Sequence, residues 1–218
     1  TYYVCFQNQL EPFDDPLVRE AFTLAIDRTY LVQNISQTGE VEAGAYVPNG
    51  VYGAEGATGP IFREEEGGGD YYDPSAEAYE ANCERARQLL AEAGYPNGEG
   101  FPDLSLLYYE SGNNALIAEA IQQMWQQNLG ITVNLQVQEH AVFASTVSSS
   151  DWTVAMYGWS ADYNDPMTML ALFTAEGLNE PRWRYKPYAG VPDDTTLNPE
   201  NEAYDAAVKA AAQTSGTE

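Results

Sequence analysis

The chain has 218 residues, and 44% of them are hydrophobic, which is enough for a buried core in one large domain or two small ones. Its 33 acidic and 9 basic residues give a formal net charge of −24, a field that repels nucleic acid and anionic lipid, so we expect no nucleic-acid partner. No stretch approaches the roughly 20 apolar residues that a membrane-spanning helix needs.

The first expected elements are a strand and a helix. An apolar run at residues 2–7 predicts a short strand. Asp14 or Asp15 can cap a helix that has Pro16 in its first turn. Residues 39–73 are rich in glycine and turn formers, and we expect an irregular loop or insertion there. Helical spacing gives the first helix one apolar face, made of Val18, Ala21, Phe22, Ala25 and Ile26.

The middle of the chain alternates helices and strands. The Asp-Pro pair at 73–74 is expected to open a second helix, which Gly94 ends. Residues 104–109 have the apolar pattern of a strand, and alternation from 131 to 137 predicts another. Because short turns join these strands through one helix, we expect them to be parallel. That helix ends at Gly130 and has an apolar stripe of Ile117, Ala120, Ile121, Met124 and Trp125.

The last third of the chain continues the alternation. Residues 141–147 predict a brief helix, 152–158 a strand and 167–173 a helix. We expect 180–197 to be irregular and 202–212 to form a final helix. This order predicts an α/β fold with a mixed sheet flanked by helices, and we expect the whole chain, residues 1–218, to form a single lobe.

Residues 157–166, at the carboxyl end of the expected strand 152–158, are the most informative stretch for function. They place an indole, small residues and a lone carboxylate where the backbone turns toward a helix. Open α/β sheets generally bind ligands at this end of their strands. The carboxylate of Asp162, beside an aromatic wall, can hold an ammonium group through charge-assisted hydrogen bonds. On the residues alone, however, capping of the helix near Pro166 is the favoured role of Asp162.

Other chemistry has little support in the residues. Cys5 and Cys83 lie in apolar settings, which predicts buried thiols rather than a disulfide or a metal pair. His140 is the single histidine and no cysteine pair has zinc-ligand spacing, so we expect no metal and no cofactor. A hydrolase that uses Asp162 and Asp165 is a less favoured alternative, because nothing identifies a matched acid and base.

Several ordered blocks of the sequence resemble one known family. Residues 12–28 contain the pattern PF-D-VR-A---AIDR, residues 89–96 read LLAEAGYP, and GFP follows at 100–102. Trp125, the string NLGI and then Gln-Glu precede the stretch 157–166, as they do in the family. The chain therefore resembles the peptide and oligopeptide binding proteins of ABC importers, which are extracytoplasmic solute receptors.

The resemblance implies a fold and a ligand site. The fold is a periplasmic-binding-protein-like (type II) lobe, and the chain matches an incomplete second lobe of a two-lobed receptor. Asp162 matches the position that receives the ligand's α-ammonium, and main-chain groups flanking Trp159 pair with a bound peptide as an added strand. The ligand-binding residues that we expect are Asp162, Trp159, Gly158, Ser160, His140 and Asn114.

Two departures from the family pattern affect the expected specificity. His140 stands where many peptide-binding relatives carry Trp, and it can line a pocket or serve as a structural histidine. Met156 and Tyr157 stand where relatives that fix short peptides often carry Arg. Without that cation, a longer peptide or a less charged ligand is accepted more easily.

We therefore expect a receptor fragment that binds oligopeptides and delivers them to an ABC importer, without enzymatic activity. Same-family receptors for a nickel complex, haem or an oligosaccharide are the first alternative, because a fold does not fix its ligand. The expected partners are a peptide, the permease subunits of the transporter and the first lobe of the same protein. The expected location is extracytoplasmic, either periplasmic or lipid-anchored at the outer face of the cell membrane.

Overall fold

The computed structural model describes residues 1–8, 10–149, 152–174 and 199–214, so the irregular stretch predicted at 180–197 lies outside the described residues. The strands are β1 (Tyr2–Phe6), β2 (Leu104–Tyr109), β3 (Val133–Gln138) and β4 (Val154–Gly158). The α-helices are α1 (Pro16–Leu24), α2 (Arg28–Tyr30), α3 (Tyr79–Glu92), α4 (Asn114–Leu129), α5 (His140–Ser149), α6 (Met167–Leu170) and α7 (Pro199–Ala211). A π-helix, η1 (Leu31–Ser36), and the 3-10 turns η2 (Gly56–Thr58), η3 (Phe62–Glu64), η4 (Pro96–Gly98) and η5 (Ala171–Phe173) complete them.

The strands form one mixed sheet in the order β1-β4-β2-β3. β2 is parallel to both β3 and β4, whereas β1 is antiparallel to β4. The predicted parallel pair and the predicted α/β class are confirmed. β3 and β4 each begin two residues later than the pattern predicts. Ile131 and Trp152 are buried like strand residues but precede the strands, so they lengthen both predictions. Alternation marks a buried apolar residue whether or not the strand has begun.

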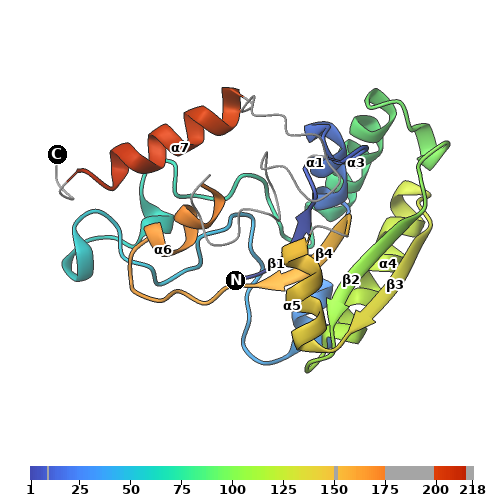
Figure 1. Ribbon diagram of the computed structural model, residues 1–218. Coiled ribbons are helices and arrows are strands. Elements are labelled where there is room, and N and C mark those ends of the chain that lie inside the picture. The colour runs from blue at the N-terminus through green and yellow to red at the C-terminus, as the bar shows by residue number, and fades with distance from the viewer. Residues whose placement is uncertain (9, 150–151, 175–198, 215–218) are drawn as a thin grey trace.

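Different helices cover the two faces of the sheet. Side chains alternate along each strand, so neighbouring residues point to opposite faces. Figure 1 shows α5 lying over the strands, with α3 and α4 on the right of the view. One face packs with α1, α3 and α4 through Leu104, Leu106, Val154 and Met156. The other face packs with α5 through Cys5, Leu107, Ala155, Phe143 and Val147.

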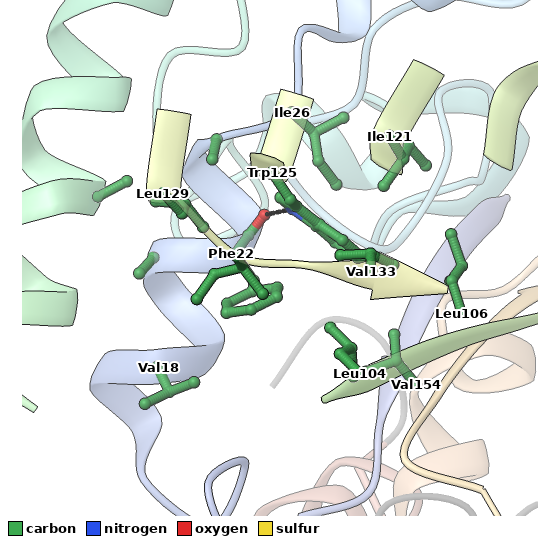
Figure 2. Close-up of a cluster of buried hydrophobic side chains, with 14 of the residues drawn as sticks. Val18, Phe22, Ile26, Leu104, Leu106, Ile121, Trp125, Leu129, Val133 and Val154 are labelled. Atoms are coloured by element: carbon green, nitrogen blue, oxygen red, sulfur yellow. Dashed lines mark hydrogen bonds between the residues drawn. The ribbon is translucent and has the colours of Figure 1, made fainter. Parts of the chain in front are cut away.

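The larger core is organised around Trp125 of α4. Its ring is fully buried and meets the edge of Phe22 with 4.9 Å between ring centroids. The indole Nε1–H donates a hydrogen bond of 2.9 Å to the carbonyl oxygen of Phe22, as the dashed line in Figure 2 shows. That oxygen is one of the carbonyls at the end of α1 that the helix itself leaves without a donor. The predicted apolar faces of α1 and α4 are therefore both confirmed as core faces.

Two predicted helix ends are confirmed. Asp15 caps α1, since its Oδ1 accepts a hydrogen bond of 2.8 Å from the backbone N–H of Leu17. Gly130 follows α4 with a φ of 72°, a left-handed conformation that favours glycine. A Cβ at Gly130 would lie only 2.3 Å from the carbonyl oxygen of Asn97, so the close approach of two backbones also requires glycine there.

The predicted start of the second helix is wrong. α3 begins at Tyr79 and not at the Asp-Pro pair at 73–74. The carboxylate of Asp73 accepts a hydrogen bond of 2.9 Å from the backbone N–H of Ser75, which closes a turn before the helix. Aspartate side chains favour such turns as readily as helix caps, so the pattern alone does not separate the two.

The segment 39–73 contains two single-turn helices, η2 and η3, and an isolated antiparallel bridge between Tyr52 and Ile61. Figure 1 shows it on the left of the view, near α6 and α7. Buried Val47 and Val51 pack with Met169 of α6, so apolar contacts with α6 connect this segment to the rest of the fold.

Cys5 and Cys83 are buried free thiols, as predicted. Within the described ranges, no helix has the length and apolar character to cross a membrane. Nor does that part of the chain bring together three or more His, Cys, Asp or Glu side chains in a group that could hold a metal ion.

We expect Trp125→Phe to lower the free energy of unfolding by about 2 to 4 kcal/mol, because it leaves a cavity and removes the donor to a buried carbonyl. Urea unfolding followed by circular dichroism measures the loss. Leu116→Ala, on an exposed position of the same helix, serves as the control and should change stability little. A loss below about 0.5 kcal/mol in Trp125→Phe would contradict the central role of this side chain.

Candidate functional site

The main chain at the end of β4 is organised by its pairing with the start of β1. The backbone nitrogen of Thr1 donates to the carbonyl oxygen of Trp159 at 2.7 Å, and the N–H of Trp159 donates to the carbonyl oxygen of Thr1 at 2.8 Å. In an antiparallel pair, hydrogen-bonded residues alternate with residues whose N–H and C=O point away from the partner strand. The main-chain groups of Gly158, which is opposite Tyr2, therefore face away from β1.

The other edge of β4 loses its partner before Gly158. The pairing of β4 with β2 ends where Leu107 is opposite Ala155, although β2 continues to Tyr109 beside β3. The two strands therefore diverge toward their carboxyl ends. Outward-facing N–H and C=O groups at such a place can pair with an extended segment of another molecule.

Tyr109, at the end of β2, connects several of the predicted site residues. The side-chain amide of Asn114 donates a hydrogen bond of 2.9 Å to the carbonyl oxygen of Tyr109, and Asn114 is buried. The ring of His140 meets the ring of Tyr109 edge-on, with 5.0 Å between centroids. His140 is exposed at the first position of α5, and its neighbour Glu139 caps that helix by accepting from the N–H of Ala141.

Tyr2 joins this group to the end of β4. Burial raises the pKa of the Tyr2 phenol, and hydrogen bonding with Tyr109 raises it further, whereas a hydrogen bond with Asn114 acts in the opposite direction. A Cβ on Gly158 would lie 2.8 Å from Cδ2 of the Tyr2 ring. The space that glycine leaves at 158 on this side is thus taken by Tyr2.

Asp162 lies in the loop after β4 and is exposed. Its backbone N–H donates a hydrogen bond of 3.0 Å to Oγ1 of Thr168, which is buried in α6. Among the described residues, the carboxylate of Asp162 has no hydrogen-bond or ion-pair partner, so it does not cap α6 there. Asp165 performs that task by accepting a hydrogen bond of 2.8 Å from the N–H of Met167.

Trp159 and Ser160 occupy different surroundings. Ser160 is exposed, whereas the indole of Trp159 is partly buried. The indole packs against two hydrophobic clusters, one on the α5 face of the sheet and one made of Val47, Val51 and Met169. The indole Nε1–H is buried and has no acceptor among the described residues. A buried donor without a partner is costly, so this N–H marks a place where an acceptor is needed.

An aromatic wall runs from the end of β2 over α5, β4 and β1 to the segment 39–73 and η5. Neighbouring rings along it meet at centroid distances of 4.6 to 6.0 Å, within the range of favourable ring contacts. Its members, in order, are Tyr109, Phe143, Tyr157, Tyr3, Tyr46 and Phe173.

The predicted site residues thus form two groups. Gly158, Trp159, Ser160 and Asp162 lie on the strand end and its loop, and His140 and Asn114 lie around Tyr109. Tyr2 and Tyr109 link the groups, and sequence reasoning missed both. Their only signal is the register of β1 and β2 against β4, which depends on pairs more than 45 residues apart in the chain.

The chain resembles known proteins over most of its length. Residues 1–180 match the model of the family described as bacterial extracellular solute-binding proteins, family 5 Middle. The periplasmic oligopeptide-binding protein OppA of Salmonella typhimurium is 33% identical over 179 residues, which cover 82% of this chain and 30% of that protein. The chain therefore spans about a third of the length of such relatives.

Solved structures give the same result. The murein tripeptide binding protein MppA of Escherichia coli is 31% identical, with a TM-score of 0.72 over 99% of this chain and 41% of its own. OppA of Haemophilus influenzae, solved in complex with RPPGFSPFR, is 26% identical, with a TM-score of 0.68 over 96% of this chain and 40% of its own.

We expect Gly158→Ala to lower the free energy of unfolding by about 1 to 2 kcal/mol, because the added methyl group overlaps the Tyr2 ring. In a Tyr2→Ala background the same change should cost far less, since the ring is absent. Denaturant unfolding of the four proteins measures this coupling. Equal costs in both backgrounds would show that Tyr2 does not impose glycine at 158.

Proposed function

This chain belongs to the bacterial extracellular solute-binding proteins of family 5, and from that membership we propose that it is one lobe of a receptor that binds oligopeptides. The receptor acts outside the cytoplasm and delivers its ligand to an ABC importer. The names of OppA and MppA, which refer to oligopeptide and peptide binding, support this reading of the ligand class.

The observation that carries the proposal is the outward-facing main chain at the end of β4. Gly158 points its N–H and C=O away from β1, at the place where β2 diverges. A peptide that adds here as a strand gains affinity from backbone hydrogen bonds, which are the same for every sequence. This mode suits a receptor for oligopeptides of varied composition.

Asp162 supplies the polar end of the proposed site. Its carboxylate is exposed and without a partner among the described residues, four positions after Gly158. An extended peptide that pairs with Gly158 and Ser160 brings its α-ammonium toward this carboxylate. The charge-assisted hydrogen bond then sets the direction of the peptide, while the backbone bonds hold its length.

The other predicted residues act beside the proposed path of the peptide, which runs from Gly158 to Asp162. We assign His140 to the wall of a side-chain pocket, because its exposed ring lies against Tyr109 at the diverging strands. Trp159 contributes its backbone pairing with Thr1 and an indole N–H that has no acceptor among the described residues. Asn114 acts through Tyr109, whose carbonyl oxygen it holds, since its own side chain is buried.

We further propose that the lobe has no enzymatic activity. The rival use of Asp162 and Asp165 as acid and base is disfavoured because Asp165 is engaged at the start of α6. Both carboxylates are exposed, which does not suit a desolvated acid–base pair. The partners of the lobe are the other lobe of the same protein and the permease subunits of the importer. Its location is periplasmic or lipid-anchored at the outer face of the cell membrane.

The ligand class is tested by mass spectrometry of small molecules released from the full-length protein after native purification. We expect peptides of mixed sequence. Haem, a nickel chelate or an oligosaccharide would move the protein to another ligand class of the same family, and a protein that releases nothing and binds no added peptide would overturn the proposal.

The role of Asp162 is tested by Asp162→Asn in the full-length protein, with affinity measured by calorimetry. The change keeps the shape of the side chain and removes its charge. When both lobes of the full-length protein enclose the peptide, binding should therefore weaken by on the order of 2 to 5 kcal/mol. N-terminal acetylation of the peptide should cause a comparable loss in the wild type. The two changes together should cost much less than their sum, because each removes the same interaction.

Asp165→Asn is the matched control for this measurement. It removes an equal charge three residues away, and asparagine retains the capping oxygen for Met167. The control should bind peptide as the wild type does. Additive effects of Asp162→Asn and acetylation, or an equal loss in Asp165→Asn, would rule out direct contact between Asp162 and the ammonium.

A further inference from the structure

The loop that carries Asp162 is packed against the segment 39–73. Buried Val47 and Val51 of that segment meet Met169 of α6 in a small apolar cluster. Tyr46, Phe62, Trp159 and Leu170 surround this cluster as partly buried neighbours. In addition, the hydroxyl of Thr1 donates a hydrogen bond of 2.9 Å to the carbonyl oxygen of Tyr46. The segment therefore forms one wall of the region in which the loop is held.

Asn164 makes the polar connection between the two. Its Oδ1 accepts a hydrogen bond of 2.6 Å from the backbone N–H of Tyr52, and its Nδ2 donates one of 3.2 Å to the carbonyl oxygen of Gly50. These bonds join residues more than 110 positions apart in the chain. Because the side chain both donates and accepts, only an amide of this length satisfies both backbone groups.

The backbone that Asn164 holds is itself well ordered by local hydrogen bonds. The N–H of Phe62 donates to the carbonyl oxygen of Val51 at 2.9 Å, and that of Gly53 donates to the carbonyl oxygen of Pro60 at 3.1 Å. These bonds flank the bridge between Tyr52 and Ile61 and make residues 51–62 a short hairpin. The hairpin is thus a fixed anchor on which the loop can be positioned.

Asp162 is therefore held from two sides. Its own N–H is bonded to Thr168 of α6, and two residues later Asn164 is bonded to the hairpin. The carboxylate itself is free of protein partners among the described residues. Since the backbone is fixed and the carboxylate is not neutralised, the loop presents a charge in a defined place.

We propose that Asn164 is a positioning residue, which sets the place of the Asp162 carboxylate by fastening its loop to the hairpin 51–62. The inference rests on the proposed binding of peptides through Asp162. It assigns to the segment 39–73 a role in ligand selection, namely preference for a free peptide N-terminus, although no side chain of the hairpin has to touch the ligand.

The test compares two probes, tetra-alanine and N-acetyl-tetra-alanine, on the full-length protein. The quantity measured is the ratio of their dissociation constants. Asn164→Ala should reduce the preference for the free N-terminus by roughly fivefold to tenfold, the scale of one or two lost hydrogen bonds. Most of the loss should fall on tetra-alanine, because the acetylated probe does not use Asp162.

Asn164→Ser provides a second variant if Asn164→Ala does not fold. Its hydroxyl is too short to reach both backbone groups, so the ratio should fall in the same direction. Asn82→Ala is the control, because Asn82 also donates a side-chain hydrogen bond to a backbone carbonyl, that of Asp73, but lies on α3. It can lower the melting temperature, yet the ratio should stay as in the wild type.

The outcomes separate this inference from the proposed function. A wild type without preference between the probes overturns the assignment of Asp162, and the role of Asn164 with it. A wild type with a preference that Asn164→Ala and Asn164→Ser leave unchanged overturns the positioning role alone. Equal weakening of both probes has the same meaning, since it reports general destabilisation rather than displacement of the carboxylate.

Discussion

The pairing of Thr1 with Trp159 is the contact on which the candidate site depends. Its two hydrogen bonds extend the β1–β4 ladder by one residue beyond the strands. These bonds engage the N–H and C=O of Trp159 with Thr1. Because the pattern alternates along an antiparallel pair, the N–H and C=O of Gly158 point away from β1. The same pairing brings Tyr2 over Gly158, and the Thr1 hydroxyl reaches the backbone of Tyr46. One register therefore determines which groups face a ligand and which are internal.

The hydrophobic core selects that register. Val4 of β1 and Met156 of β4 are opposite each other and pack in the cluster with α1 and α4, whereas Cys5 and Ala155 pack on the α5 side. A shift by one residue would exchange these faces and expose apolar side chains along the whole pair. The same shift would turn the main chain of Gly158 toward β1. The packing of the core and the geometry of the candidate site are thus two results of a single constraint.

Local pattern predicted most of the elements, since period and capping residues act over a few positions. The α1 face around Phe22, the parallel pair and the end of α4 at Gly130 follow from such signals. The residues that complete the site do not. Tyr2 lies beside Gly158 and interacts with Tyr109 only because distant strands pair, and Asn164 reaches the hairpin across the fold. The sequence also does not decide which aspartate caps α6, because Asp165 offers the same chemistry as Asp162 three residues later.

The separation of Thr1 and Trp159 by 158 positions has a consequence for how the protein folds. Contacts between residues far apart in the chain form slowly, because closing a long loop costs conformational entropy before the contacts can stabilise the fold. As the chain leaves the ribosome, α1, α3 and α4 can begin to assemble around Trp125 while the apolar residues of β1 are without a partner strand. β4 can insert between β1 and β2 only after residues 154–159 emerge. The loop that follows β4 and carries Asp162 can take its place only then. The candidate site at the end of β4 therefore forms after the helical core, and its formation marks the completion of the sheet.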